Sequence, residues 1–147
     1  MESTRIRDTE HAAVDALIAA AGLPLDGIES WRAHQLVTRD RGGIAATAAL
    51  EIHGADAVLR SVAVAADRRG EGLGDAVVRA ALVHARSAGV ATVYLLTETA
   101  PEFFRRFGFE VVERAAAPPA IQESVEYCGV CPATATAMQL NLRGEPS

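Results

Sequence analysis

Residues 62–74 read Val-Ala-Val-Ala-Ala-Asp-Arg-Arg-Gly-Glu-Gly-Leu-Gly, an apolar strand that runs into a turn dense in glycine. A helix is expected to follow over Leu73–Ala88, because its apolar residues recur at helical spacing: Val77, Val78, Ala81, Leu82 and Ala85. Glycine lets the backbone come close to a ligand, and the start of a helix offers unpaired N–H donors. The pattern predicts a cradle for phosphate or pyrophosphate, with Arg68 and Arg69 supplying positive charge. The alternative is a strand-to-helix turn that binds nothing.

The segments around this turn predict one α+β domain with a single mixed sheet. In chain order, the expected strands lie near Ile6 and at His34–Arg39, Ile44–His53, Ala57–Val64, Val90–Thr97, Phe109–Glu113 and Thr134–Leu142. The other expected helices lie at His11–Ala21, with Thr9 as its cap, at Ile28–Trp31 and at Ala100–Phe107. Val90–Thr97 is apolar and has a helix on each side, which is typical of a central parallel strand. Arg114–Glu126 contains two adjacent prolines and is expected to be a surface loop.

Composition restricts the function further. The chain has 147 residues, 50% hydrophobic and 22% charged, which fits one globular domain over residues 1–147. Its net charge of −5 argues against a general binder of nucleic acid or membrane surfaces, because no surplus of cations can meet phosphates. No apolar stretch approaches the ~20 residues that span a bilayer, and the first residues lack a signal pattern. We therefore expect a cytoplasmic protein.

Two landmarks in the chain resemble those of a known family. The stretch Leu59–Val64 followed by Arg69, Gly72 and Gly74 resembles the coenzyme A signature of the GNAT superfamily of N-acyltransferases, Gln/Arg-x-x-Gly-x-Gly/Ala. Ala100–Phe109 is similar to the second landmark, a short helix that ends in Gly-Phe. The resemblance covers nearly the whole chain. It implies a mostly antiparallel sheet that is splayed at a central parallel pair and flanked by helices.

The same resemblance implies acetyl-CoA as the cosubstrate and assigns the residues that hold it. The backbone of Val62, Ala63 and Val64 would pair with the pantetheine arm, and an N–H near Val62 would polarise the thioester carbonyl. The pyrophosphate would rest on the backbone N–H groups of Arg69, Gly70, Glu71, Gly72, Leu73 and Gly74. Many members have a tyrosine acid where this chain has Phe104, so Phe104 is expected to pack against the pantetheine or the sheet.

The acceptor amine must lose a proton before it attacks, so a base is needed. Glu98 follows the central strand at its carboxyl end, where ligands bind in open α/β sheets, although it could also be a solvated residue near the next helix. Glu51 and His53 share one strand face and are the other candidates, with His53 expected to be solvated. The departing thiol could leave as thiolate, or Thr97, Tyr94 or Cys131 could supply a proton through water.

Arg60 is the strongest candidate for contacting the acceptor, because an arginine is unexpected in a strand that is otherwise apolar. A guanidinium suits a carboxylate, phosphonate or arsonate, and the alternative is a structural ion pair with Glu51 or Asp56. A narrower resemblance, to arsenic-resistance N-acetyltransferases and related amino-acid N-acetyltransferases, rests on residues 59–61, 94–97, 131–133 and Met138. It implies a small amino-acid-like acceptor that Arg60, Ser61 and Cys131 contact.

Cys128 and Cys131 also invite a zinc or redox interpretation. Structural zinc needs four ligands, and the remaining candidates are scattered, so we expect no metal. The leading hypothesis is an N-acetyltransferase that transfers acetyl directly to a small anionic amine in a ternary complex. The alternatives are a peptide or protein N-acetyltransferase and a non-catalytic acyl-CoA sensor. A homodimer is expected from the family alone.

Overall fold

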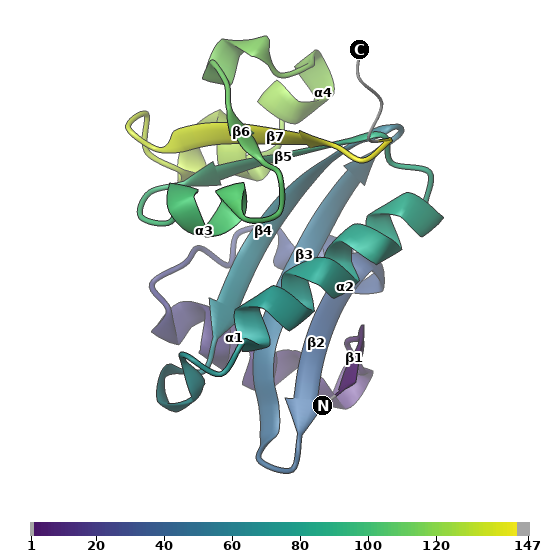
Figure 1. Cartoon of the computed structure of the whole chain (residues 1–147), viewed down its shortest axis with the longest axis vertical. Coiled ribbons are helices and arrows are strands. Elements are labelled where there is room, and N and C mark those ends of the chain that lie inside the picture. Colours follow the sequence, from purple (N-terminus) through teal and green to yellow (C-terminus); the bar gives the residue numbers. More distant parts are fainter. Residues whose placement is uncertain (1, 144–147) are drawn as a thin grey trace. The chain divides into compact units, whose positions relative to one another are not determined.

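The computed structural model describes residues 2–143, in which seven strands form one mixed sheet (Figure 1). The strands are β1 (Glu2–Arg5), β2 (Gln35–Asp40), β3 (Gly43–His53), β4 (Asp56–Val64), β5 (Thr92–Thr97), β6 (Glu110–Val111) and β7 (Thr136–Asn141). Their order in the sheet is β1-β2-β3-β4-β5-β7-β6, and β4–β5 is the parallel pair. The mixed sheet with a parallel pair at β4–β5 confirms the predicted fold class.

Four α-helices accompany the sheet: α1 (His11–Ala20), α2 (Leu73–Ser87), α3 (Pro101–Arg105) and α4 (Pro119–Gln122). The prediction that Thr9 caps α1 is wrong, because Asp8–Glu10 form a 3₁₀ turn and Glu10 precedes the helix without a side-chain cap bond. The prediction of a loop at 114–126 is also incomplete. Pro119 occupies the first turn of α4, where proline is tolerated, and Ile121 is fully buried.

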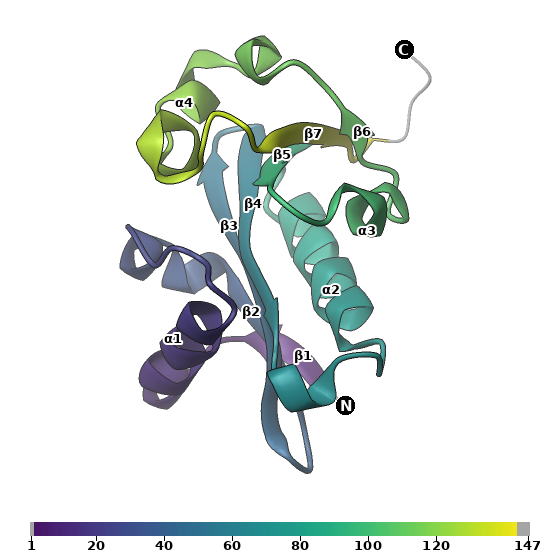
Figure 2. The ribbon, with the colours of Figure 1, turned by 90° about the vertical axis from the view of Figure 1, so that its left-hand side faces the viewer.

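By its internal contacts the chain divides into two units, of which the first comprises residues 2–50 and 61–84. Within it, α1 and α2 cover opposite faces of the strands (Figure 2). Both faces are therefore apolar, and four alanines of β3 are fully buried: Ala45, Ala46, Ala48 and Ala49. On the α1 side, Val14 and Ile18 pack against Val37 of β2. On the α2 side, the predicted stripe is buried except Leu82, which is half-buried.

The second unit comprises residues 51–60 and 85–143. Strand β5 is its centre and pairs along its whole length with β7, from Thr92 opposite Asn141 to Thr97 opposite Thr136. Figures 1 and 2 show α3 and α4 on opposite faces of β5–β7. The parallel ladder to β4 covers Asp56–Val58, and within the described residues it ends at Val58–Tyr94 although both strands continue.

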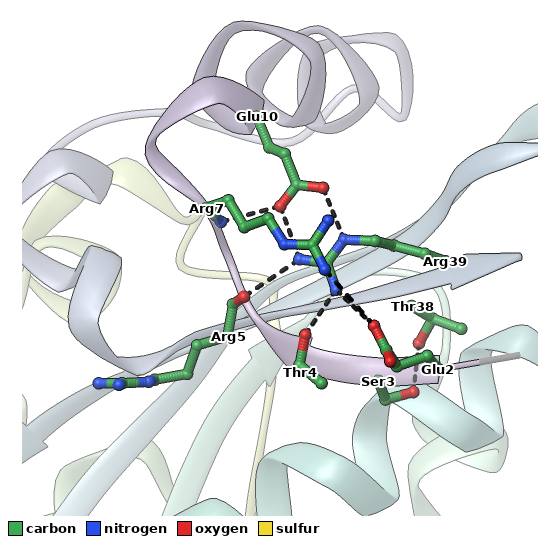
Figure 3. Close-up of polar contacts among 8 residues, drawn as sticks. All are labelled: Glu2, Ser3, Thr4, Arg5, Arg7, Glu10, Thr38 and Arg39. Carbon is green, nitrogen blue, oxygen red and sulfur yellow. Dashed lines mark hydrogen bonds and ion pairs between the residues drawn. The ribbon is translucent and has the colours of Figure 1, made fainter.

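A cluster of ion pairs ties β1 to β2 and to the turn before α1 (Figure 3). Arg39 donates from Nε and Nη2 to the carboxylate of Glu10 at 2.6 Å each, and from Nη2 to the carbonyl oxygen of Arg5 at 3.1 Å. Both side chains are about nine-tenths buried, at 12% and 11% exposed. The hydrogen bond from Arg39 lowers the pKa of Glu10 from 4.5 to about 2.

We expect Glu10→Gln to lower the free energy of unfolding by about 2 kcal/mol at pH 7, because charge-assisted hydrogen bonds are lost. The folded-state pKa of Glu10 lies below its ordinary value, so its contribution is complete above pH 4.5 and is lost as the pH falls toward about 2. Thermal unfolding of both proteins across this range is the measurement, and the two curves should converge at its acid end. Glu2→Gln is the control, since Glu2 is 60% exposed and 3.6 Å from Arg39. An equal loss in Glu2→Gln would contradict the account.

No helix among residues 2–143 is both long and apolar enough to cross a membrane.

Candidate functional site

Ser61 interrupts the regular geometry of β4. Its φ of 57° lies in the left-handed region, which makes it the one described residue other than glycine with a positive φ. Ser61 is buried, at 7% exposed, and the next residues, Val62 and Val64, are half-buried. A side chain held in this conformation costs about 1 kcal/mol, and such strain is concentrated at functional sites. The backbone distortion at Ser61 directly precedes Val62–Val64, the segment predicted to bind the pantetheine arm.

We expect Ser61→Gly to raise the melting temperature by about 2–4 °C, because glycine adopts a positive φ without strain. Ser61→Ala is the matched variant, since it removes the same hydroxyl and keeps the strained backbone. Thermal unfolding of the three proteins separates the two effects. If the melting temperature of Ser61→Gly is no higher than that of Ser61→Ala, the backbone at this position is not strained.

A turn with left-handed glycines joins β4 to α2. Ala65 donates its N–H to Ala45 at 2.8 Å, a 3₁₀ turn covers Ala66–Arg68, and α2 then begins at Leu73. Gly70 and Gly72 have φ of 85° and 79°, and a Cβ added to either would meet open space. Residues 69–72 are exposed. An open turn with left-handed glycines ahead of a helix of 15 residues is suited to binding an anion.

The two arginines of the turn differ in what they contact. Arg68 donates from Nη1 to Asp40 at 3.0 Å and from Nε to Glu71 at 3.2 Å. This bond to Arg68 lowers the pKa of Asp40 to about 2, and the N–H of Gly42 contributes. The expectation that Arg68 offers its charge to a ligand is therefore not met, because Arg68 holds the turn on the β2–β3 hairpin. Arg69 is exposed and forms no ion pair with any residue in 2–143.

In the second unit, the structure brings Arg60 and Glu51 into direct contact. Nη1 of Arg60 donates to Oε2 of Glu51 at 2.9 Å, with side chains 0% and 2% exposed. Nε2 of His53 lies 3.7 Å from Oε1 of the same carboxylate, and this side chain is 25% exposed. The structure therefore contains the ion pair between Arg60 and Glu51, which the sequence analysis gave as the alternative to acceptor binding by Arg60. Glu51 is consequently sealed from solvent and held by a cation.

The carboxyl end of β5 carries the other candidate base. Glu98 is exposed directly after the strand, and Thr97 is half-buried. Oγ1 of Thr97 accepts the N–H of Ala100 at 3.1 Å, which fixes the chain just before α3. The hydroxyl hydrogen of Thr97 points elsewhere, because the oxygen is the acceptor in that bond.

Cys131 lies near both Glu98 and Glu126. Burial raises the pKa of the Cys131 thiol to about 12, and the Glu126 and Glu98 carboxylates act in the same direction. Cys131 therefore remains a protonated thiol at neutral pH. Glu126 is buried at 6% exposed, and residue patterns alone did not single it out, because it stood at the end of an expected surface loop.

The turn that begins at Glu126 and is followed by Cys131 is anchored by Arg114. Its guanidinium donates to the carbonyl oxygens of Pro132 at 2.8 Å and Tyr127 at 2.9 Å, and it lies over the Tyr127 ring. The turn, Glu126–Val130, has π-helical hydrogen bonding, a form often found at functional sites. Both cysteines are free thiols. No group of three or more metal-binding side chains occurs in the described part of the chain.

Phe104 of α3 is buried, at 7% exposed. Its ring makes edge contacts with Phe103 and Phe109, with centroids 5.0 and 5.9 Å away. It supplies no proton, so it orders α3 by packing.

A family model and several solved structures match the chain. The model of the acetyltransferase (GNAT) domain family matches residues 31–111 of the chain. No curated protein sequence matches this chain.

Among solved structures, Rv2747 from Mycobacterium tuberculosis, in complex with CoA and NLQ, has a TM-score of 0.80 at 20% identity, covering 96% of this chain and 99% of that one. N-acetylglutamate synthase from Neisseria gonorrhoeae, complexed with coenzyme A and N-acetyl-glutamate, has a TM-score of 0.82 at 17% identity, covering 96% of this chain and 35% of that one. The ribosomal-protein-S18-alanine N-acetyltransferase from Escherichia coli has a TM-score of 0.71 at 18% identity, covering 96% and 93%. At these identities the likeness shows a shared fold.

Proposed function

Because the chain belongs to the GNAT acetyltransferase family, we propose that it transfers acetyl from acetyl-CoA to the amine of a small, anionic, amino-acid-like acceptor. The observation that carries the proposal is the continuous run from strained Ser61 through Val62–Val64 into the open glycine turn at the start of α2. The likeness to N-acetylglutamate synthase supports an amino-acid acceptor. Because acetyl-CoA is a metabolite of the cell interior, we propose a cytoplasmic reaction.

The residues of this run fit acetyl-CoA, which supplies a reactive thioester when it is bound. The open space at Gly70 and Gly72 leaves room for the pyrophosphate. Backbone N–H groups from Arg69 to Gly74 donate to it, and Arg69 adds a cation that no described carboxylate neutralises. Val62, Ala63 and Val64 pair with the pantetheine arm, and Phe104 packs α3 beside it. Holding the reactants in place would account for much of the rate.

Glu98 is the proposed base, because it is exposed at the end of β5 whereas Glu51 is sealed and bound to Arg60. It would take the amine proton through water. Thr97 would relay a proton with its hydroxyl. Cys131, which holds its proton at neutral pH, would donate a hydrogen bond on the acceptor side.

Arg60 and Ser61 are proposed to bind the acceptor. Nη1 of Arg60 donates to Oε2 of Glu51 at 2.9 Å, which holds the buried guanidinium in place. Glu51 would then act through Arg60, by fixing the plane of the guanidinium. An acceptor carboxylate, phosphonate or arsonate suits a fixed guanidinium.

Thiol release from acetyl-CoA tests the proposal directly. The acceptor panel holds monocarboxylic and dicarboxylic amino acids, phosphonate and arsenical amino acids, and a peptide with a free N-terminus. We expect the highest kcat/KM with an acceptor that carries an extra anionic group, and mass spectrometry should find acetyl on its amine. Turnover of the peptide alone would identify a peptide N-acetyltransferase instead. Tight binding of acetyl-CoA with no turnover of any amine would identify a sensor.

A further inference from the structure

A cavity of about 350 Å³ lies in the first unit where β1 ends. Its lining comes from the end of β1, the segment that leads into α1, the first residue of α1 and the 3₁₀ helix Ile28–His34: Arg5, Ile6, Asp8, His11, Arg32 and Ala33. None of these residues belongs to the proposed acetyl-transfer machinery. The volume lies at the lower end of the range for small-molecule sites.

Arg5 is the cation of this lining whose charge is not already matched. Arg7 pairs with Glu2, and Arg39 pairs with Glu10, whereas no carboxylate within residues 2–143 forms an ion pair with Arg5. Figure 3 shows the Arg5 side chain turned away from that cluster, with its guanidinium on the other side of β1. A guanidinium in this position is available for a ligand.

Histidines lie in this lining and next to it in the chain. His11 lines the cavity, and His34, which follows Ala33, lies 2.9 Å from His84 between Nδ1 and Nε2. Burial lowers the pKa of His84, and the charges of His34 and Arg5 contribute, which places Arg5 near this pair. His11 is the histidine that itself lines the cavity, together with Arg5.

Two residues of the lining limit which ligands fit. Arg32 donates from both terminal nitrogens to Asp15, at 2.9 and 2.8 Å, so its charge is already matched. Asp8 is the single carboxylate of the lining and would repel an anion. A ligand must therefore gain enough from Arg5 and His11 to tolerate Asp8.

We propose that this cavity binds a small oxyanion, a phosphate or a polycarboxylate, through Arg5 with His11 as a second donor. A planar guanidinium bonds such groups in bidentate fashion. The proposal goes beyond acetyl transfer and does not depend on it.

Calorimetric titration of the full chain with inorganic phosphate, and separately with citrate, tests the proposal and distinguishes the two chemistries. Coenzyme A is kept in excess, so that phosphate does not occupy the glycine turn. We expect Arg5→Ala to weaken binding of the preferred anion about tenfold or more. Arg7→Ala is the matched control, because it removes the same charge from an exposed residue outside the cavity and should bind like the wild type.

Asp8→Asn is expected to change the affinity for the anion in the opposite direction to Arg5→Ala. Removing its charge should tighten the binding of an anion severalfold. Weaker binding in Asp8→Asn would overturn the proposal in favour of a ligand with a cationic group. Equal binding by Arg5→Ala and Arg7→Ala, or no binding by the wild type, would also overturn it. The readout is binding alone, so its failure is distinct from failure of acetyl transfer.

Discussion

Arg60→Met is expected to lower the free energy of unfolding by about 3–5 kcal/mol, because it leaves the carboxylate of Glu51 buried without its partner. Both side chains are sealed from solvent, at 0% and 2% exposed, so water cannot replace the lost bond. Chemical denaturation at pH 7 measures the effect. The size of this loss reflects the penalty of an unpaired buried charge more than the strength of the pair.

The double variant Arg60→Met/Glu51→Leu separates stability from function. Two apolar side chains of similar size should recover most of the lost stability, since a buried ion pair and a packed apolar pair are often close in free energy. We expect the double variant to be folded and yet to show an acceptor KM raised far more than its acetyl-CoA KM. A stable double variant with wild-type KM for the acceptor would remove Arg60 from the acceptor site and leave it a structural residue.

Gly72→Val is expected to raise the KM and Kd for acetyl-CoA by about 10–100-fold, because the side chain enters the open space of the turn and displaces one or two charge-assisted hydrogen bonds. The acceptor KM should change little. Initial rates and calorimetric titration with acetyl-CoA measure the two quantities.

Gly22→Val is the matched control for this substitution. Gly22 follows α1, has a φ of 76° against 79° at Gly72, and likewise has open space at its Cβ position. Both variants carry the same backbone strain and should lose comparable stability, but only Gly72→Val should weaken acetyl-CoA binding. Equal KM values for acetyl-CoA in the two variants would mean that the turn does not hold the cosubstrate.

Residue patterns predicted the elements whose signals are local. The helical stripe of α2 and the apolar run of β5 each lie within one continuous segment, and both elements end within two residues of the predicted bounds. The mostly antiparallel sheet with its central parallel pair followed from the resemblance and is confirmed. Pro119 gave the wrong signal at α4, because proline both ends helices and begins them.

The features that patterns missed depend on contacts between distant residues or on the backbone. Serine has no particular preference for a positive φ, so nothing at Ser61 indicated the distortion in β4. Arg68 pairs with Asp40 of the β2–β3 hairpin, which lies 28 residues earlier in the chain, so the sequence around Arg68 does not indicate this ion pair. Arg114 donates to the carbonyl oxygens of Tyr127 and Cys131 and so holds the turn in which Glu126 lies near Cys131. These contacts depend on the fold and cannot be read from the sequence near Glu126. Tertiary structure decides each of these.

A crystal structure of the full chain with acetyl-CoA tests the central claim most directly. The account predicts pyrophosphate oxygens within hydrogen-bond distance of the backbone N–H groups between Arg69 and Gly74, and the pantetheine arm along Val62–Val64. The thioester should then lie beside Ser61. A pyrophosphate bound away from this turn, or a pantetheine arm away from β4, would contradict the account.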